Sequence, residues 1–343
     1  MNYRIIKPIP TPEEIAKEFP LSTSAKNKIQ RDREEVKNIL SGKDPRKLII
    51  IGPCAAWPQE AVLEYAKRLK PIADELDDRI KIIMRVYIQK PRTTKGWTGP
   101  INRPDPLADP DIANGIRYCR KMMVEVIELG LPIADEALFT HNAGGFIELL
   151  SWVAIGARSV EDQEHRIFAS AIDCPVGMKN TTAGSIEIGV NSIVSAQNSH
   201  TVVLDRHHVM TEGNHYAHLV LRGGKNGPNY SPDHVREAKT YLEKQNIKNP
   251  AIIIDCSHDN CIIDGKKLPH TQANIGKEIF AYLEKNSDIK HLIKGLMLES
   301  FIKEGNQKID SDSEIDRGGL SIVDPCLGWD QSKQLLYDLV KLI

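Results

Sequence analysis

Two groups of side chains in the sequence could do chemistry, and both follow the ends of short apolar runs. Arg binds phosphate or carboxylate with two parallel hydrogen bonds, and Lys supplies a point charge. Gathered in one place, such cations would repel one another unless an anion lay among them. For any single cation, pairing with an acidic residue is an equally good interpretation, but for the whole set the pattern predicts a ligand with at least two anionic groups. The six cations are Arg85, Lys90, Arg92, Arg158, Lys179 and Arg222.

The second group combines one thiol, one imidazole and two carboxylates. It consists of Cys54, His258, Glu299 and Asp324. A mixed sulfur, nitrogen and oxygen set suits a borderline divalent ion such as Mn, Fe, Co or Zn, whereas Mg and Ca prefer oxygen alone. The separations along the chain are long, so no local spacing supports the site. The prediction of a metal site therefore depends on a fold that brings these four residues together.

Eight aliphatic runs, separated by helical patterns, are the elements that would position these residues. They are Leu48–Cys54, Ile80–Tyr87, Leu131–Ala137, Trp152–Ala157, Cys174–Asn180, Thr201–Arg206, Ala251–His258 and Leu292–Ser300. Runs this apolar indicate parallel strands buried on both faces. Eight consecutive strand–helix units predict a (β/α)8 TIM barrel, in which chemistry lies at the carboxyl ends of the strands. A doubly wound open sheet is the alternative, disfavoured because no Gly-x-Gly-x-x-Gly follows the first strand.

Two further segments lie outside this rhythm. Residues 1–45 are polar and mostly helical in pattern, which predicts an N-terminal extension ahead of a catalytic barrel at 46–343. The stretch "YAHLVLRGGKNGPNYS" reads as one more strand-like segment, predicted to be a β-hairpin inserted after strand six, at about 207–226. A chain of 343 residues fits a single α/β barrel of this kind.

Composition excludes several classes of function. The formal net charge of −1 argues against non-specific binding to nucleic acid or to a membrane. No apolar run approaches the roughly 18 residues of a membrane span, and the N-terminus lacks the apolar core of a signal peptide. The expected location is cytoplasmic. The six cysteines include no Cys-x-x-Cys pair, so buried free thiols are expected rather than a disulfide framework.

Long motifs place the chain beside a known family. They include "IIGPC", "MRVYIQKPRTTKGW", "SWVAIGARSVEDQEHR", "CPVGMKN", "LRGGKNGPNYS", "IDCSH" and "SIVDPCLGW". Over nearly its whole length the sequence resembles the metal-dependent type I DAHP (3-deoxy-D-arabino-heptulosonate 7-phosphate) synthases, in particular the branch with an N-terminal extension and an inserted hairpin. The resemblance implies a transferase that joins phosphoenolpyruvate to erythrose 4-phosphate and opens the shikimate pathway to aromatic amino acids. It also implies a homodimer or homotetramer assembled through the extension.

The resemblance assigns a role to each candidate residue. It implies that Cys54, His258, Glu299 and Asp324 hold one divalent ion, with Mn favoured, and that Arg85, Glu136, Arg158, Lys179 and Arg222 bind phosphoenolpyruvate. The loop Lys90, Pro91, Arg92, Thr93 and Thr94, together with Asp324, would bind the aldose phosphate. Cys54, His258 and Lys90 are the implied catalytic residues. The proton donor to the new alkoxide is either Lys90 or a metal-bound water.

The sequence departs from the family at several positions. Ala55-Ala56-Trp57-Pro58 stands where relatives usually read Ser-Ile-His-Asp, which changes the polarity beside the metal and could affect the room for the aldose. Ala137-Leu138-Phe139 and Asp173 also differ, in the region where relatives bind inhibitory aromatic amino acids, so altered feedback control is expected. Two alternative functions follow: a paralogue that uses another aldose phosphate, and a catalytically silent homologue that binds a ligand or partner. The complete metal and phosphate sets argue against the silent homologue.

Overall fold

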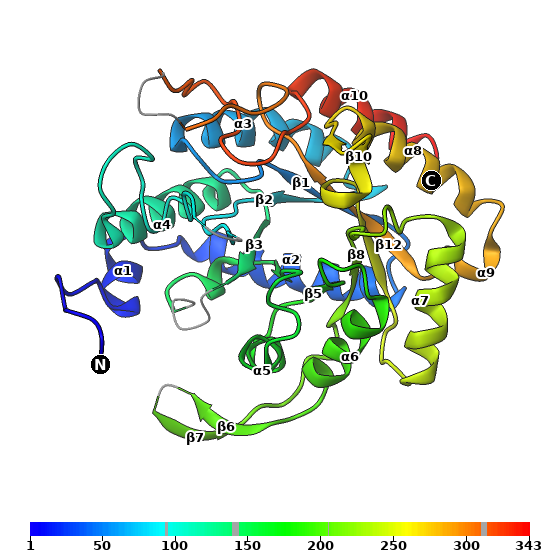
Figure 1. Cartoon of the computed structure of the whole chain (residues 1–343), viewed down its shortest axis with the longest axis horizontal. Helices are drawn as coiled ribbons and strands as arrows, with labels where there is room; N and C mark the ends of the chain where they lie inside the picture. The colour runs from blue at the N-terminus through cyan, green and yellow to red at the C-terminus, as the bar shows by residue number, and fades with distance from the viewer. Residues whose placement is uncertain (93–94, 139–143, 205, 310–313) are drawn as a thin grey trace.

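A computed structural model of the chain describes residues 1–92, 95–138, 144–204, 206–309 and 314–343. Eight parallel strands close into a barrel (Figure 1). Around the barrel they are β1 (Lys47–Gly52), β12 (Ile293–Glu299), β9 (Ile252–Asp255), β8 (His218–Leu221), β5 (Val176–Lys179), β4 (Trp152–Ile155), β3 (Ile133–Ala137) and β2 (Ile80–Arg85). The first strand, β1, pairs with both β2 and β12, so the sheet has no edge. The predicted (β/α)8 barrel is confirmed, and the open-sheet alternative is excluded.

Helices surround the strands on the outside. They are α3 (Gln59–Glu75), α4 (Ile112–Glu128), α5 (Gln163–Ala171), α6 (Ile186–Gln197), α7 (Pro232–Lys244), α8 (Thr271–Leu283), α9 (Ser287–Lys290) and α10 (Trp329–Val340). In α4 the apolar residues Ile116, Cys119 and Met123 recur at helical spacing, and all three are buried. Pro71 stands inside α3 without dividing it. All six cysteines are buried and free, as expected from their scattered positions.

The assignment of the sixth strand was wrong. The run predicted as Thr201–Arg206 forms β6 (Thr201–Leu204), which pairs antiparallel with β7 (His207–Met210) in a hairpin that projects from the barrel (Figure 1). The sixth barrel strand is β8, inside the segment predicted as the hairpin insertion. The hairpin therefore precedes strand six instead of following it.

The cause of this error is visible in the two strands. Val203 is aliphatic but largely exposed in β6, because only a two-stranded sheet surrounds it. His218 is polar but buried in β8, where its Nε2 accepts a hydrogen bond from Trp152 Nε1 at 3.1 Å. Burial lowers the pKa of His218 to about 4, so the ring is neutral and fits the barrel interior. Hydropathy alone therefore favoured the wrong segment.

Two helices form most of the N-terminal extension. The first, α1 (Pro12–Glu18), is capped by Thr11, and the second, α2 (Thr23–Ser41), ends at Gly42 in the left-handed conformation with φ 79°. Figure 1 shows α2 crossing behind the strands. Its residues Val36, Ile39 and Leu40 pack with side chains of the barrel interior. The side chain of Arg33 on α2 donates to the carbonyls of Leu150 and Ile147, in the segment that leads into β4 and contains the short 3₁₀ helix η2 (Ile147–Leu149). Thus α2 closes the amino end of the barrel and leaves the carboxyl end open.

Candidate functional site

A cavity of about 290 Å³ lies at the carboxyl end of the barrel strands. Most of the predicted site residues line it, namely Lys90, Pro91, Arg92, Glu136, Arg158, Lys179, Arg222, His258 and Asp324. Sequence reasoning assigned no role to the other lining residues, which are Ala157, Thr182, Lys225, Asp259, Lys267 and Val323. Thr93 and Thr94 lie outside the described residues. Among the described lining residues there are seven Lys or Arg against three Asp or Glu, so the cavity favours an anionic ligand.

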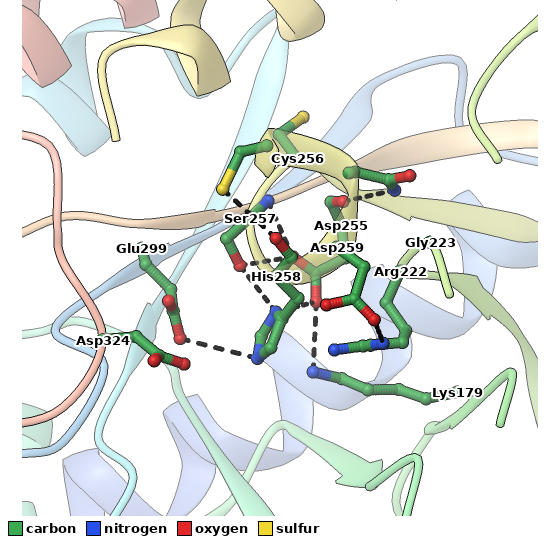
Figure 2. A network of polar contacts seen from close by, with 12 residues as sticks. Lys179, Arg222, Gly223, Asp255, Cys256, Ser257, His258, Asp259, Glu299 and Asp324 are labelled. Atoms are coloured by element: carbon green, nitrogen blue, oxygen red, sulfur yellow. Dashed lines mark hydrogen bonds and ion pairs between the residues drawn. The ribbon is translucent and has the colours of Figure 1, made fainter. Parts of the chain in front are cut away.

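Three of the four predicted metal ligands meet at one point beside this cavity. One ligand atom each from Cys54, Glu299 and Asp324 lies within 4.8 Å of the other two. The fourth, His258, contacts this cluster through Glu299, with His258 Nε2 3.8 Å from Glu299 Oε1 (Figure 2). Sulfur, imidazole nitrogen and carboxylate oxygen are thus brought together, the donor set that suits a borderline divalent ion. The residues present fit such an ion.

Cys54 reaches the cluster because β1 ends at Gly52. There the backbone has φ 155°, and an added Cβ would stand 2.7 Å from the carbonyl oxygen of Arg85. The thiol of Cys54 is fully buried, and burial together with the neighbouring Glu299 charge raises its pKa to about 12. A thiol in this environment keeps its proton until a cation arrives, and binding of a divalent ion by the thiolate would release that proton.

Asp255, at the end of β9, is a positioning residue to which sequence reasoning gave no role. Its Oδ2 lies 2.8 Å from His258 Nδ1 and 3.1 Å from Lys179 Nζ (Figure 2). Burial alone would raise the pKa of Asp255, but the charges of His258 and Lys179 hold it well below its ordinary value. The carboxylate therefore stays ionised and fixes the proton on Nδ1, which turns Nε2 toward Glu299. The signal for this role was a carboxylate three residues before a candidate histidine ligand.

Arg85 is the most deeply buried cation of the site. Its Nη2 donates to Glu299 Oε1 at 3.1 Å, and its guanidinium carbon lies 4.0 Å above the ring of Tyr87. Among the described residues its Nη1 has no hydrogen-bond partner. Burial would lower the pKa of Arg85, but the acidic groups around it raise the value overall, so the side chain is charged. A buried, charged donor with an unused nitrogen is suited to an acceptor from a ligand.

The remaining cations reach the cavity from several strands. Lys90 follows β2, and its Nζ donates to the carbonyl oxygen of Cys54 at 2.8 Å. Lys179 ends β5, and Arg222 follows β8 and forms an ion pair with Asp259. Glu136 on β3 shares this space, and a Cβ at Gly156 would stand 2.1 Å from its Oε1. Glycine at that position of the β4 loop is therefore required to admit the glutamate.

Trp57, the main departure from the family pattern, belongs to a small apolar cluster. It is 1% exposed and packs with Trp97, Ile315 and Ile322. Its Nε1 donates to the carbonyl oxygen of Pro104 at 2.9 Å. It is not among the described residues that line the cavity. Trp57 therefore stabilises the packing of loops beside the site, and other residues determine the shape of the cavity.

Comparisons with known proteins agree with this geometry. The sequence matches the DAHP synthetase I family over residues 18–337. The chain belongs to that family. It is 38% identical over 336 residues to the Tyr-sensitive phospho-2-dehydro-3-deoxyheptonate aldolase of Salmonella typhimurium, covering 96% of this chain and 92% of that protein. It is 39% identical over 338 residues to the Trp-sensitive aldolase of Enterobacter agglomerans, covering 97% and 94%.

A solved structure extends the likeness to three dimensions. The phospho-2-dehydro-3-deoxyheptonate aldolase of Francisella tularensis SCHU S4 superposes with a TM-score of 0.91 at 34% identity, covering 100% of this chain and 98% of that one. The predicted type I family is therefore confirmed. Members of this family are generally metal-dependent, which agrees with the donor set around Glu299. No helix in the described part of the chain is long and apolar enough to cross a membrane.

Proposed function

We propose that this chain condenses phosphoenolpyruvate with erythrose 4-phosphate to give DAHP and phosphate, the first step of the shikimate pathway. The family supports this reaction and its class, a transferase that forms a carbon–carbon bond. The observation that carries the proposal is the cation-rich cavity beside the cluster of Cys54, Glu299 and Asp324. Two phosphorylated substrates and a divalent ion need these two features side by side.

One part of the cavity suits phosphoenolpyruvate. Arg158, Lys179 and Arg222 would bind its phosphate, and Arg85 and Lys179 would contact its carboxylate. The unused Nη1 of Arg85 supplies a donor for such an acceptor. Arg222 would exchange its present partner, Asp259, for the phosphate, because a phosphate offers several acceptor oxygens to one guanidinium.

The loop after β2 would hold the second substrate. Arg92 lines the cavity, and its Nε donates to the carbonyl oxygen of Trp97 at 2.7 Å, which fixes the side chain within its own loop. Its terminal nitrogens would then meet the phosphate of erythrose 4-phosphate, assisted by the neighbouring threonines that sequence analysis predicted. Holding both substrates in attack geometry accounts for much of the rate enhancement in a condensation of this kind.

Cys54, His258, Glu299 and Asp324 would hold one divalent ion, with Mn favoured, which when bound polarises the aldehyde oxygen as a Lewis acid. C3 of phosphoenolpyruvate attacks that aldehyde carbon, water adds at C2, and the resulting hemiketal phosphate expels phosphate. Lys90 is the proposed proton donor to the new alkoxide. Burial would lower the pKa of Lys90, but the surrounding acidic groups Cys54, Glu299 and Glu136 raise it, so its Nζ carries the proton to be donated.

The alternatives are not favoured by the comparisons. A silent homologue would have no use for the ligand cluster and the phosphate cations together. A paralogue for another aldose phosphate was suggested by Ala55–Pro58, but Trp57 lies in the apolar cluster with Trp97 and not among the described cavity residues. Altered feedback control, a homodimer or homotetramer and a cytoplasmic location stay predictions.

The test is phosphate release from phosphoenolpyruvate by the Mn-loaded protein, measured with and without erythrose 4-phosphate. We expect release only with the acceptor, loss of activity with a chelator, and recovery when Mn is restored. A panel of pentose and hexose phosphates serves as the matched control for acceptor choice. Failure to release phosphate while Mn is bound, or a clear preference for another aldose phosphate, would contradict the proposed reaction.

A further inference from the structure

A short hairpin beside the predicted metal ligands Cys54, Glu299 and Asp324 contributes a cation to the cavity, and sequence analysis did not predict this cation. It consists of β10 (Ile262–Ile263) and β11 (Lys266–Lys267), joined by Asp264 and Gly265. Both turn residues have positive φ, 50° and 74°, as a two-residue type I′ hairpin requires. Asp-Gly is the sequence favoured for this turn. The hairpin is therefore a specified element of the fold.

The register of the hairpin separates its two lysines. Ile262 pairs with Lys267 and Ile263 with Lys266, so the two lysines point to opposite faces. Lys266 and Ile263 are exposed, whereas Lys267 lines the cavity. The hairpin follows directly on the 3₁₀ turn η3 (His258–Cys261), and Leu268 N donates to Cys261 O at 3.1 Å. The turn that carries His258 thus also fixes the direction of Lys267.

Lys267 binds one of the predicted metal ligands. Its Nζ lies 2.8 Å from Asp324 Oδ2. The other carboxylate of the cluster, Glu299, has its own cation, Arg85. The two cations differ in freedom of movement: Arg85 is fully buried, whereas the side chain of Lys267 is 28% exposed on a surface hairpin. A partly exposed lysine can turn its long side chain toward solvent, but a fully buried arginine cannot.

We propose that Lys267 is a positioning residue that holds the Asp324 carboxylate in place in the metal-free protein and competes with the divalent ion for it. The inference rests on the proposed function, because it takes Asp324 as a metal ligand. A divalent ion that enters the cluster must share or displace the ammonium group. Lys267 therefore preorganises the carboxylate while weakening metal affinity, which makes the ion exchangeable.

The alternative role for Lys267 predicts the opposite change in metal affinity when the lysine is removed. If Lys267 only oriented Asp324 from outside without opposing the ion, its removal would leave the carboxylate less ordered and weaken metal binding. If it competes, removal of its charge relieves repulsion between a single and a double positive charge several ångströms apart. In a water-like dielectric that repulsion is worth about a tenfold change in affinity.

The experiment measures the Kd of Mn²⁺ for the metal-free protein by competition with a fluorescent chelator. Lys267→Met keeps the unbranched apolar stem of the side chain and removes the charged terminal group, and we expect it to bind Mn²⁺ about tenfold more tightly. Lys267→Arg restores the charge and should return the Kd to that of the unmodified protein. Lys266→Met, on the exposed face of the same hairpin, is the matched control and should leave the Kd unchanged. Circular dichroism of each variant establishes that it is folded.

Cys54→Ser separates the two proposals. Loss of Mn²⁺ binding in Cys54→Ser, with unchanged or weaker binding in Lys267→Met, would overturn the role of Lys267 and leave the metal site standing. Unchanged binding in both variants would show that the ion binds elsewhere, which overturns the proposed metal site and this inference with it. Tighter binding in Lys267→Met, with no phosphate release by the unmodified protein, would support the inference and contradict the proposed reaction.

Discussion

The two ends of the barrel use buried charge in different ways. At the amino end, Lys81 of β2 lies 2.9 Å from Asp32 and 2.8 Å from Glu35, both on α2. Arg46 joins the same network through Glu35 and Asp44. Here each cation meets carboxylates of the protein itself, so the network serves the fold.

At the carboxyl end, the charges do not balance within the protein. The described residues around the cavity carry more cations than acids, and Arg85 has a nitrogen without a partner among them. Such an arrangement is stable only if several charges are shared with a ligand or solvent. In this chain, buried cations that outnumber the neighbouring carboxylates indicate a ligand-binding site. Buried cations that are each paired with carboxylates of the protein indicate a role in stability.

Removal of a cation from the cavity at the carboxyl end should have the largest effect. We expect it to lower activity and to leave stability unchanged. Arg222→Gln should lower kcat/KM for phosphoenolpyruvate roughly 10²–10³-fold, because a charged donor to the phosphate of phosphoenolpyruvate is lost. Steady-state phosphate release measures it. Arg236→Gln, which removes a surface arginine from α7, is the control and should have normal kinetics. A near-normal kcat/KM in Arg222→Gln would show that Arg222 does not bind the phosphate of phosphoenolpyruvate in the cavity.

Removal of a cation from the amino end should instead lower stability. Among the described residues, Lys81→Met leaves the buried Asp32 with the partly exposed Lys28 as its one cationic partner. The substitution should reduce the free energy of unfolding by about 3 kcal/mol. Urea denaturation measures the loss, and kcat at 25 °C should be unchanged. Lys277→Met, at a surface pair on α8, should cost well under 1 kcal/mol. A Lys81→Met variant of normal stability but impaired kcat would contradict the assignment of the amino-end network to stability.

The pH dependence of stability should also differ in sign between two single carboxyl groups, Asp135 near the cavity and Glu35 at the amino end. Asp135 is buried near the carboxyl end of β3 and accepts hydrogen bonds from Ile88 N and Glu136 N. These bonds lower its pKa, but burial outweighs them and raises the pKa from 3.8 to about 8. Between about pH 4 and 8 the unfolded chain has lost this proton and the folded chain keeps it. The free energy of unfolding therefore falls as pH rises, by at most about 1.4 kcal/mol per pH unit for this one group.

Asp135→Asn removes that slope, and urea denaturation from pH 5.5 to 8 measures the difference between the variant and the unmodified protein. In the described part of the chain, the ionisable groups that interact with Asp135 include Glu136, Lys90, Cys119 and Tyr87. For Glu35 at the amino end the sign is opposite to that of Asp135. Burial would raise the pKa of Glu35, but Lys81 and Arg46 lower it, so its contribution to stability is lost as pH falls through that lowered pKa. Identical pH slopes in Asp135→Asn and the unmodified protein would show that Asp135 is ionised in both states.

The smallest effect is expected at an exposed ion pair. Lys37 on α2 lies 2.9 Å from Asp173, whose side chain is 76% exposed. A double-mutant cycle with Lys37→Met and Asp173→Asn should give a coupling energy of about 0.5 kcal/mol or less. Thermal denaturation of the four proteins measures it. A coupling above 1 kcal/mol would mean that solvent exposure does not separate structural from incidental pairs in this chain.

Much of the barrel could be predicted because its strands are unusually apolar and alternate with amphipathic helices. The site followed from the same reasoning, since residues at the carboxyl ends of parallel strands must converge. The misplaced sixth strand shows the limit. His218 is buried with its Nε2 bonded to Trp152, which lies on β4, two strands away around the barrel, and that contact has no local signal in the sequence.

The missed site residues fall into two kinds. Asp255 lies inside the predicted strand Ala251–His258, and its role became visible only from the geometry of His258. Lys267 depends on the turn at Asp264-Gly265, which the sequence does show as an Asp-Gly pair between short apolar and basic segments. That pair is a hairpin signal, but the flanking strands are two residues long, too short for a pattern of alternation to reveal them.

The position of α2 has a consequence for where this chain could be shortened. Val36, Ile39 and Leu40 share one core with Leu48, Ile50 and Ile253. A chain that began at residue 46 would present these barrel residues to water at its amino end. The helix α2 and the barrel therefore form one unit of folding, and removal of α2 would require polar replacements in the strands beneath it.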